Sequence, residues 1–436
     1  MNDEKTFEQV QFDLPVQNKS IIKVIGVGGG GGNAVNNMYG KIEGVSYMLI
    51  NTDEVDLNHS DVPEKIVLGS GIGAGNDPTK AMALAEEDAD KIREGLTDGT
   101  RMVFITASMG GGTGTGASPI VARIAHEMGI LTVAIVTIPF KFEGSQKIRK
   151  ALRYIQRLSE NVDALLVINN EKLFDIYTNM QLSEAFRMAD ETLLNATRSI
   201  VEIITIHGYV NTDFADVYNT LKDGNVAIMN MGYASGERRV IDAIEDALSS
   251  PLVNTANIKS ARKILVHFYS STEHQLRIDE LDQLREFTQD IVDEMDLIWG
   301  ATLDDSLGDQ LKITLIATGF NLSDIPGMSN IFPRQTQAQA EAPSLETPAT
   351  ATPVQPAAAN LSARHAPTSH VQTATPSTPS PETAEDTETS IDMAFDELYK
   401  TPQKVKEEEI ISIDIEEDDD ILQTPTFMRN RGIGNN

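Results

Sequence analysis

The feature that most constrains this chain is a glycine- and threonine-rich heptapeptide, Gly110–Gly116. A short apolar run within Arg101–Met109 precedes it and is typical of a buried strand, whereas apolar residues at helical spacing follow it. Pro119 suits the first turn of that helix. A strand, a glycine loop and a helix in this order turn backbone N–H groups toward an anion, and the two threonines add hydroxyl donors. The pattern favours a phosphate-binding loop over a flexible linker, because linkers rarely separate a buried strand from a helix.

Composition narrows the class of protein. A chain of 436 residues is long enough for two or three domains, and the absence of cysteine excludes disulfides, thiolate metal sites and cysteine nucleophiles. Residues 1–20 hold no secretory signal, and the longest apolar run, Ile130–Ile138, is too short to span a bilayer. We therefore expect a soluble, cytoplasmic protein. The net charge of −30 argues against nucleic-acid binding and direct attraction to anionic lipid, although backbone amides and a metal ion can still attract a nucleotide.

The N-terminal half alternates between strand and helix patterns. This alternation predicts an α/β fold with a Rossmann-like, mostly parallel sheet covered on both faces. We place a polar arm at residues 1–19 and the nucleotide-binding domain at residues 20–182. The predicted strands are Ile21–Val27, Tyr47–Asn51, Val103–Ala107, Thr132–Thr137 and Ala164–Ile168.

A long central helix is predicted at residues 183–205, with Ser183 as a candidate cap. Segment 206–224 links it to a smaller α+β domain at residues 225–320. The central helix carries an apolar stripe made of Phe186, Ala189, Leu193, Leu194, Ala196, Ile200 and Ile203. The smaller domain is predicted to contain strands Asn225–Met231, Lys263–Tyr269 and Lys312–Ala317 and helices Glu237–Leu248 and Ile278–Met295.

The C-terminal part changes abruptly in composition. Residues 331–420 are acidic, rich in proline and poor in aromatic residues, which predicts a disordered linker. The chain closes with a peptide at residues 421–436, in which Ile421–Arg429 combines apolar and basic residues. This peptide is interpreted as a docking element on a long tether; the alternative is a frayed terminus.

A second glycine loop, Gly26–Asn33, follows the first predicted strand and precedes a helix predicted to start at Ala34. Its spacing matches the dinucleotide fingerprint, and Asp53 falls about where a ribose-binding acid would lie. An NAD-dependent oxidoreductase is therefore one hypothesis. However, a third glycine loop, Gly69–Gly75, and the heptapeptide exceed what a dinucleotide fold needs, and no P-loop is present.

Several of these motifs together carry a resemblance. Gly110–Gly116 looks like the signature loop of the tubulin family. With Gly28–Asn33, Phe142–Gly144 and Asn211–Asp216, it resembles the FtsZ branch, the bacterial tubulin-like cell-division GTPases. The resemblance covers about residues 20–320 in order, together with the terminal peptide.

The resemblance implies that the nucleotide is GTP or GDP, with Mg²⁺ held mainly through its phosphates. Glu143 matches the ribose-binding glutamate, Phe186 would stack on the base, and Asp190 would accept from guanine N1–H and N2–H₂. Lys147 stands where many members carry arginine, so it could pair with a phosphate but lacks the bidentate fork. The diphosphate would lie on Gly29, Gly30, Gly31, Gly32 and Asn33, and the outer phosphates on Gly112, Thr113 and Gly114.

The resemblance also assigns catalysis to Asn211, Asp213 and Asp216. Taken alone, these residues would be interpreted as a turn and a helix cap. In the family, the loop enters the site of the next subunit, so that GTP is hydrolysed only in head-to-tail filaments of the mid-cell division ring. The docking peptide Ile421–Arg429 would then bind a membrane-attached adaptor. A nucleotide-bound scaffold without turnover is a further alternative, against which these three residues argue.

Overall fold

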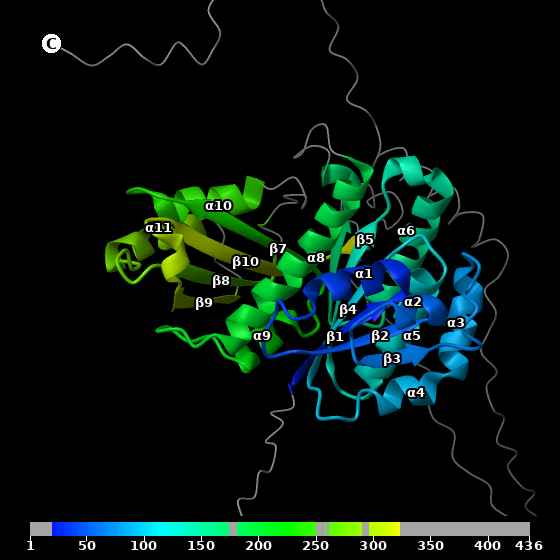
Figure 1. The fold of residues 1–436 in the computed structure, drawn as a ribbon. Coiled ribbons are helices and arrows are strands. Elements are labelled where there is room, and N and C mark those ends of the chain that lie inside the picture. The colour runs from blue at the N-terminus through cyan, green and yellow to red at the C-terminus, as the bar shows by residue number, and fades with distance from the viewer. Residues whose placement is uncertain (1–19, 174–180, 250–257, 259–260, 290–295, 323–436) are drawn as a thin grey trace, which may run out of the picture. The chain divides into compact units, whose positions relative to one another are not determined.

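The computed structural model describes residues 20–173, 181–249, 258, 261–289 and 296–322 (Figure 1). The predicted N-terminal arm, the linker at residues 331–420 and the peptide at residues 421–436 lie outside the described residues. In the part of the chain that the structure describes, no helix is both long and apolar enough to cross a membrane.

Six parallel strands form the N-terminal part of a ten-stranded sheet, in the order β3-β2-β1-β4-β5-β6. The predicted strands are all present, although β3 was not predicted, because exposed Glu64 and Lys65 give it no apolar run. The strands are β1 (Ile22–Val27), β2 (Ser46–Asn51), β3 (Glu64–Val67), β4 (Met102–Ser108), β5 (Leu131–Ile138) and β6 (Ala164–Asn169).

Helices cover both faces of this sheet, as Figure 1 shows. One buried apolar cluster contains residues of α5 and α6, and a second, on the other face, contains residues of α1 and of the central helix α8 (Leu182–Thr205). Because both faces are covered, the central strands β1 and β5 are apolar and buried along their whole length, apart from a few polar residues such as Lys23. The helices of this part are α1 (Gly28–Met38), α2 (Glu54–Asn58), α3 (Pro78–Glu87), α4 (Ala89–Glu94), α5 (Thr113–Glu127) and α6 (Ser145–Ser159).

The central helix α8 runs from Leu182 to Thr205. The proposed cap was wrong: Gln181 is the N-cap, it makes no side-chain capping bond, and Ser183 lies inside the first turn. The predicted apolar stripe is buried except at Phe186, which is 41% exposed. An aromatic ring that stays exposed on an otherwise buried stripe is available to a ligand.

The C-terminal domain continues the sheet in the order β7-β10-β8-β9, and β10 is antiparallel to both of its neighbours. It has its own apolar core between the sheet and α10, which confirms the predicted α+β character. Strand β9 was not predicted, and the predicted end of the second helix at Met295 lies outside the described residues. The elements are α9 (Phe214–Leu221), β7 (Asn225–Ala234), α10 (Arg239–Ser249), β8 (Lys263–Ser270), α11 (Ile278–Gln289), β9 (Asp296–Leu303) and β10 (Leu311–Phe320).

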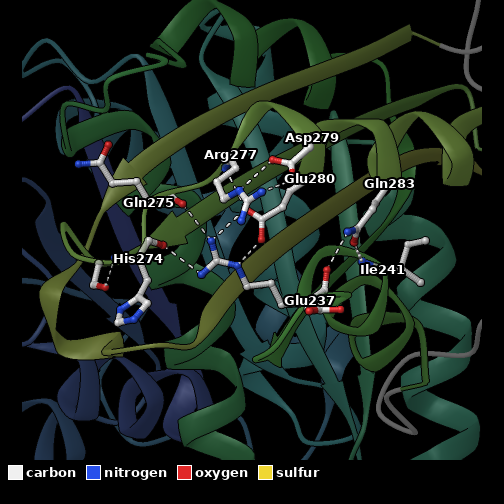
Figure 2. Close-up of polar contacts among 10 residues, drawn as sticks. Glu237, Ile241, His274, Gln275, Arg277, Asp279, Glu280 and Gln283 are labelled. Atoms are coloured by element: carbon white, nitrogen blue, oxygen red, sulfur yellow. Dashed lines mark hydrogen bonds and ion pairs between the residues drawn. The ribbon is translucent and has the colours of Figure 1, made fainter.

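A buried ion pair fastens α10 to α11. The Arg239 guanidinium donates to both carboxylate oxygens of Glu280, over 2.7 and 3.0 Å, and also to the carbonyl oxygens of His274 and Gln275. Figure 2 shows Glu280 and its neighbour Arg277 beside the loop that carries His274 and Gln275. Every oxygen of this carboxylate thus has a charged or hydrogen-bonded partner, which is the condition under which a buried ion pair is tolerated.

Candidate functional site

The two main glycine loops meet at the point where the strand order reverses. From β1 the chain continues to β2 on one side, whereas from β4 it continues to β5 on the other, and β1 pairs directly with β4. In an open parallel sheet this arrangement leaves a crevice at the carboxyl ends of the two strands, where nucleotides bind. The loops after β1 and β4 are Gly28–Asn33 and Gly110–Gly116.

Both helices begin inside the glycine runs rather than after them. Helix α1 starts at Gly28 and not at Ala34, and α5 starts at Thr113, which places Pro119 within the helix and not in its first turn. Neither helix has a side-chain cap on its first turn. The first backbone N–H groups of two helices are therefore available to phosphate oxygens.

The two helix starts pack so closely that side chains would not fit between them. Gly28 has a φ of +72°, and a Cβ there would lie 2.5 Å from the backbone nitrogen of Gly114. A Cβ at Gly30 would collide with Ser108, and one at Gly31 would collide with the carbonyl of Thr106. Glycine is thus required here both by conformation and by space. The structure brings the predicted diphosphate and outer-phosphate residues into one cradle.

The two threonines of the heptapeptide have different environments. The Thr113 hydroxyl is partly exposed and lies 2.6 Å from the Thr52 hydroxyl, so it can reach a ligand. Thr115 is fully buried and its Oγ1 accepts from the Gly110 backbone N–H over 2.8 Å. The expectation that both threonines would donate to phosphate was therefore wrong for Thr115, which shapes the loop instead.

The third glycine loop also borders the cradle. A Cβ on Gly112 would lie 3.1 Å from Asn76 and 3.2 Å from the Ala74 side chain. Lys150 of α6 donates to the Asn76 carbonyl over 2.9 Å. The hydrogen bond from Lys150 holds the loop after β3 beside the outer-phosphate residues. The glycines of this loop did not predict that position from the sequence.

Glu143 and Lys147 lie together after β5. Glu143 Oε1 accepts from the Phe140 backbone N–H over 3.0 Å, and its Oε2 lies 3.2 Å from Lys147 Nζ. Lys147 is one helical turn from Glu143, so the ion pair forms along the helix start. The carboxylate is partly buried but retains lone pairs for a pair of ribose hydroxyls.

An aromatic cluster marks the predicted base-binding position. Phe186 packs edge-on against buried Phe140 with ring centroids 5.5 Å apart, and Phe142 stacks on Phe140 at 5.0 Å. Phe186 and Phe142 are 41% and 53% exposed. Asp190, one turn along α8 from Phe186, is partly buried, and this burial raises the pKa of its carboxyl to about 6. A desolvated carboxylate next to an exposed ring favours a ligand that offers N–H donors.

Asp53, the candidate ribose-binding acid of the dinucleotide hypothesis, caps a helix. Its carboxylate accepts from the backbone N–H groups of Val55 and Asp56, so it caps the start of α2. Asp53 supported the dinucleotide fingerprint in the sequence, and in the structure it serves as a helix cap.

Asn211, Asp213 and Asp216 lie at the other edge of the sheet. Arg101, which precedes β4, lies 4.8 Å over the ring of Phe214, and Lys222 pairs at 2.6 Å with Asp163, which precedes β6. Both ends of α9 are therefore attached at the amino edge of the parallel strands, whereas the glycine loops lie at the carboxyl edge. One subunit cannot bring the two sets of residues together.

Locally, the two aspartates form a capping box. Asp213 Oδ1 accepts from the backbone N–H groups of Ala215 and Asp216, and Asp216 Oδ2 accepts from the Asp213 N–H over 3.0 Å. Asn211 is exposed and its Oδ1 accepts weakly from the Gly208 N–H at 3.4 Å. The capping interpretation of these residues is thus correct, and it leaves the second oxygen of each carboxylate outside the capping box.

Comparisons with known proteins identify the family. The sequence model described as "Tubulin/FtsZ family, GTPase domain" matches residues 21–178, and "FtsZ family, C-terminal domain" matches residues 225–321. A cell division protein FtsZ from Porphyromonas gingivalis is 52% identical over 329 residues, covering 74% of this chain and 71% of that protein. One from Aquifex aeolicus is 44% identical, covering 69% and 83%. The chain belongs to the FtsZ family.

Solved structures agree with this assignment. An empty FtsZ dimer from M. jannaschii is 39% identical with a TM-score of 0.61, covering 70% of this chain and 89% of that one. CetZ1 from Haloferax volcanii, at 21% identity and a TM-score of 0.59, shares the fold and covers 69% and 94%. The protein is therefore a filament-forming cell-division GTPase with a tubulin-like domain. The oxidoreductase hypothesis and the scaffold hypothesis find no support in these relatives.

Sequence reasoning missed Thr52 and Ser108 as parts of the cradle and Phe140 as part of the aromatic cluster. Thr52 follows β2 directly, at the same edge of the sheet as the glycine loops. This position after a parallel strand could have identified Thr52 from the sequence. Phe140 and Ser108 lie next to predicted motifs but are identified only by their contacts in space.

Proposed function

We propose that GTP binds in the crevice at β1 and β4 and is hydrolysed there by residues from the next subunit of a filament. Gly29–Asn33 would hold the diphosphate, and Gly112, Thr113 and Gly114 the outer phosphates. Glu143 would bind the ribose, with Lys147 holding that carboxylate and adding positive charge near the phosphates. Phe186 would stack on guanine, and Asp190 would accept its N–H groups.

The observation that carries this proposal is the position of Asp213 and Asp216 at the edge of the sheet opposite the cradle. When identical subunits stack head to tail, the amino edge of one faces the carboxyl edge of the next. Asn211, Asp213 and Asp216 would then complete the neighbour's site. The oxygens outside the capping box would orient and polarise the attacking water. Such a contact is heterologous and does not close, so it extends into an open filament.

We also propose that Mg²⁺ is held mainly by the nucleotide. Among the described residues, no group of three His, Asp or Glu side chains could hold a metal ion. Mg²⁺ usually keeps several waters and binds through phosphates and one or two protein ligands, so the nucleotide in the cradle would carry the ion. When bound, the ion would neutralise charge that develops on the phosphates. The protein residues would position the nucleotide and the water.

The cellular part of the proposal follows from the family. The filaments would form at the division site on the cytoplasmic side of the membrane, and Ile421–Arg429 would bind a membrane-attached adaptor. The peptide lies outside the described residues. Removing residues 421–436 should leave GTP turnover and polymer mass unchanged while abolishing recruitment to adaptor-bearing vesicles. Unchanged recruitment would contradict the docking role.

The shared-site proposal is tested by measuring GTP turnover per subunit against protein concentration, with light scattering in parallel. Turnover should be close to zero below a critical concentration and rise with polymer mass. Asp213→Ala should bind GTP normally and hydrolyse it poorly. Asp223→Asn is the matched control, because Asp223 is an exposed acid just beyond the other end of α9 and should be dispensable. Turnover per subunit that stays constant from high dilution upward would refute the shared site.

A further inference from the structure

The loop before α9 is fastened to strand β9. Val210 and Ala301 exchange two backbone hydrogen bonds, of 3.2 and 2.9 Å, which adds a short antiparallel bridge to the last strand of the sheet. A Cβ on Gly208 would collide with the Ala301 carbonyl and lie 2.7 Å from Thr302 Oγ1. The backbone of this loop therefore rests directly on the C-terminal domain.

Within the loop, side chains alternate between solvent and the sheet. Asn211 and Asp213 are exposed, whereas Thr212 between them is buried. Thr212 Oγ1 lies 2.9 Å from His267 Nδ1, and His267 Nε2 lies 2.9 Å from Thr302 Oγ1. The imidazole is 1% exposed. A continuous buried hydrogen-bond chain thus runs from β9 through β8 to the residue between the two functional side chains.

The sequence makes room for this chain at position 300. A Cβ on Gly300 would lie 2.6 Å from Thr212 Oγ1 and 2.8 Å from His267 Nδ1. Gly300 adopts no left-handed conformation that would by itself call for glycine. Glycine at position 300 therefore leaves the space in which the Thr212 and His267 side chains meet.

The imidazole is neutral under physiological conditions. Burial, assisted by the nearby Lys312 charge, lowers the pKa of His267 to about 4. A neutral imidazole has one N–H donor and one acceptor nitrogen, and each of the two threonine hydroxyls can rotate to supply the complementary partner. With both nitrogens engaged, the ring is fixed in orientation, and breaking one contact would leave a buried polar atom unpaired.

We propose that His267 is a positioning residue for GTP hydrolysis, which acts through Thr212 to set where Asn211 and Asp213 project toward the neighbouring subunit's nucleotide. This inference rests on the proposed role of the loop. It makes β8 and β9 of the C-terminal domain part of the hydrolytic machinery, although neither strand carries a residue of the proposed GTP-binding site. The GTP cradle lies at the opposite edge of the sheet, so nucleotide affinity should not depend on His267.

Thr212→Val is the sharpest test, because valine keeps the shape of threonine and removes only the hydroxyl. We expect GTP turnover per polymerised subunit to fall about tenfold, the scale on which outer-shell partners act. The affinity of the unpolymerised protein for GTP should stay within about twofold of the unsubstituted value. Thr212→Ser should restore turnover, since serine retains the hydroxyl.

Gly300→Ala provides a second, independent variant. Its Cβ should displace Thr212 and His267 while the sequence of the loop stays unchanged, and it should reduce turnover to a similar extent. The control is Thr314→Val, because Thr314 is buried on β10 directly opposite His267. That variant removes a neighbouring hydroxyl without removing the Thr212–His267 contact, and it should hydrolyse GTP normally.

The outcomes separate this inference from the shared-site proposal. If Asp213→Ala loses turnover while Thr212→Val and Gly300→Ala keep it within about twofold, His267 does not position the loop. If Asp213→Ala itself keeps full turnover, the proposed catalytic role of the loop fails. Equal losses of turnover in Thr212→Val, Thr212→Ser and Thr314→Val would also overturn the inference, because the effect would then follow general packing.

Discussion

We predict that the raised pKa of Asp190 makes nucleotide binding depend on pH. Burial raises the pKa of this carboxyl from 3.8 to about 6. Only the ionised form can accept both N1–H and N2–H₂ of guanine, so protonation should weaken binding. The affinity for the guanine nucleotide should therefore be highest above the pKa of Asp190 and should fall as the pH drops through about 6. Binding should also release protons near this pH, because the guanine donors stabilise the ionised form.

The size of the effect follows from the titration. With a pKa of about 6, the ionised fraction of Asp190 falls from roughly nine-tenths at pH 7 to roughly one-tenth at pH 5. If binding requires the ionised form, the dissociation constant for GDP should rise about tenfold between these pH values, which corresponds to about 1.4 kcal/mol. Titration calorimetry of the unpolymerised protein with GDP measures this change directly.

Asp190→Asn is the matched control. An amide retains one oxygen acceptor but does not ionise, so binding at pH 7 should be weaker and should lose the contribution of this group to the pH dependence. The phosphates of GDP also titrate near pH 6, but they do so equally in both proteins. The decisive quantity is therefore the ratio of the two dissociation constants. A ratio that stays constant from pH 5 to pH 7 would refute the role of Asp190 as an ionised acceptor.

Three further substitutions test the cradle, the base position and the C-terminal domain. Phe186→Ala should weaken GDP binding by about tenfold in the same calorimetry, the scale of a lost stacking contact, with little loss of stability because the ring is already partly exposed. Gly28→Ala should lose GDP binding, because its φ of +72° and the 2.5 Å approach to Gly114 both oppose a side chain; normal affinity would contradict the cradle geometry. Glu280→Gln should lower the free energy of unfolding of the C-terminal domain by about 3 kcal/mol in urea, since Arg239 would remain buried without its counter-ion.

The sequence predicts well where the two glycine loops lie, directly after the strands β1 and β4, and their close approach at Gly28 leaves no room for a side chain. It predicts the start of each helix poorly. Glycine has a low intrinsic helix propensity, so local rules begin α1 at Ala34, whereas the structure begins it at Gly28. Packing against β1 and β4 overrides that propensity.

Other features have no local signature at all. Strand β3 carries exposed Glu64 and Lys65 and lacks an apolar run, although it pairs in register with β2. The contact between Thr212 and His267 joins residues 55 positions apart, and neither residue belongs to a recognisable pattern. Such contacts depend on the order of strands in the sheet, which periodicity alone does not encode.

The capping box would allow one pair of aspartates to serve both the fold and the proposed reaction. One oxygen of Asp213 satisfies two N–H groups at the start of α9, and one oxygen of Asp216 returns a bond to Asp213. These bonds fix both carboxylates with no further side chain. The remaining oxygens can then act on water while the cap stays intact.

A helix start at the amino edge of the sheet is therefore a suitable place for half of an active site, because its local stability does not depend on the partner subunit. The cradle at the carboxyl edge has the same property, since its shape comes from glycine packing within one subunit. In the proposed shared site, each half would be formed in the free protein, and assembly would supply their proximity.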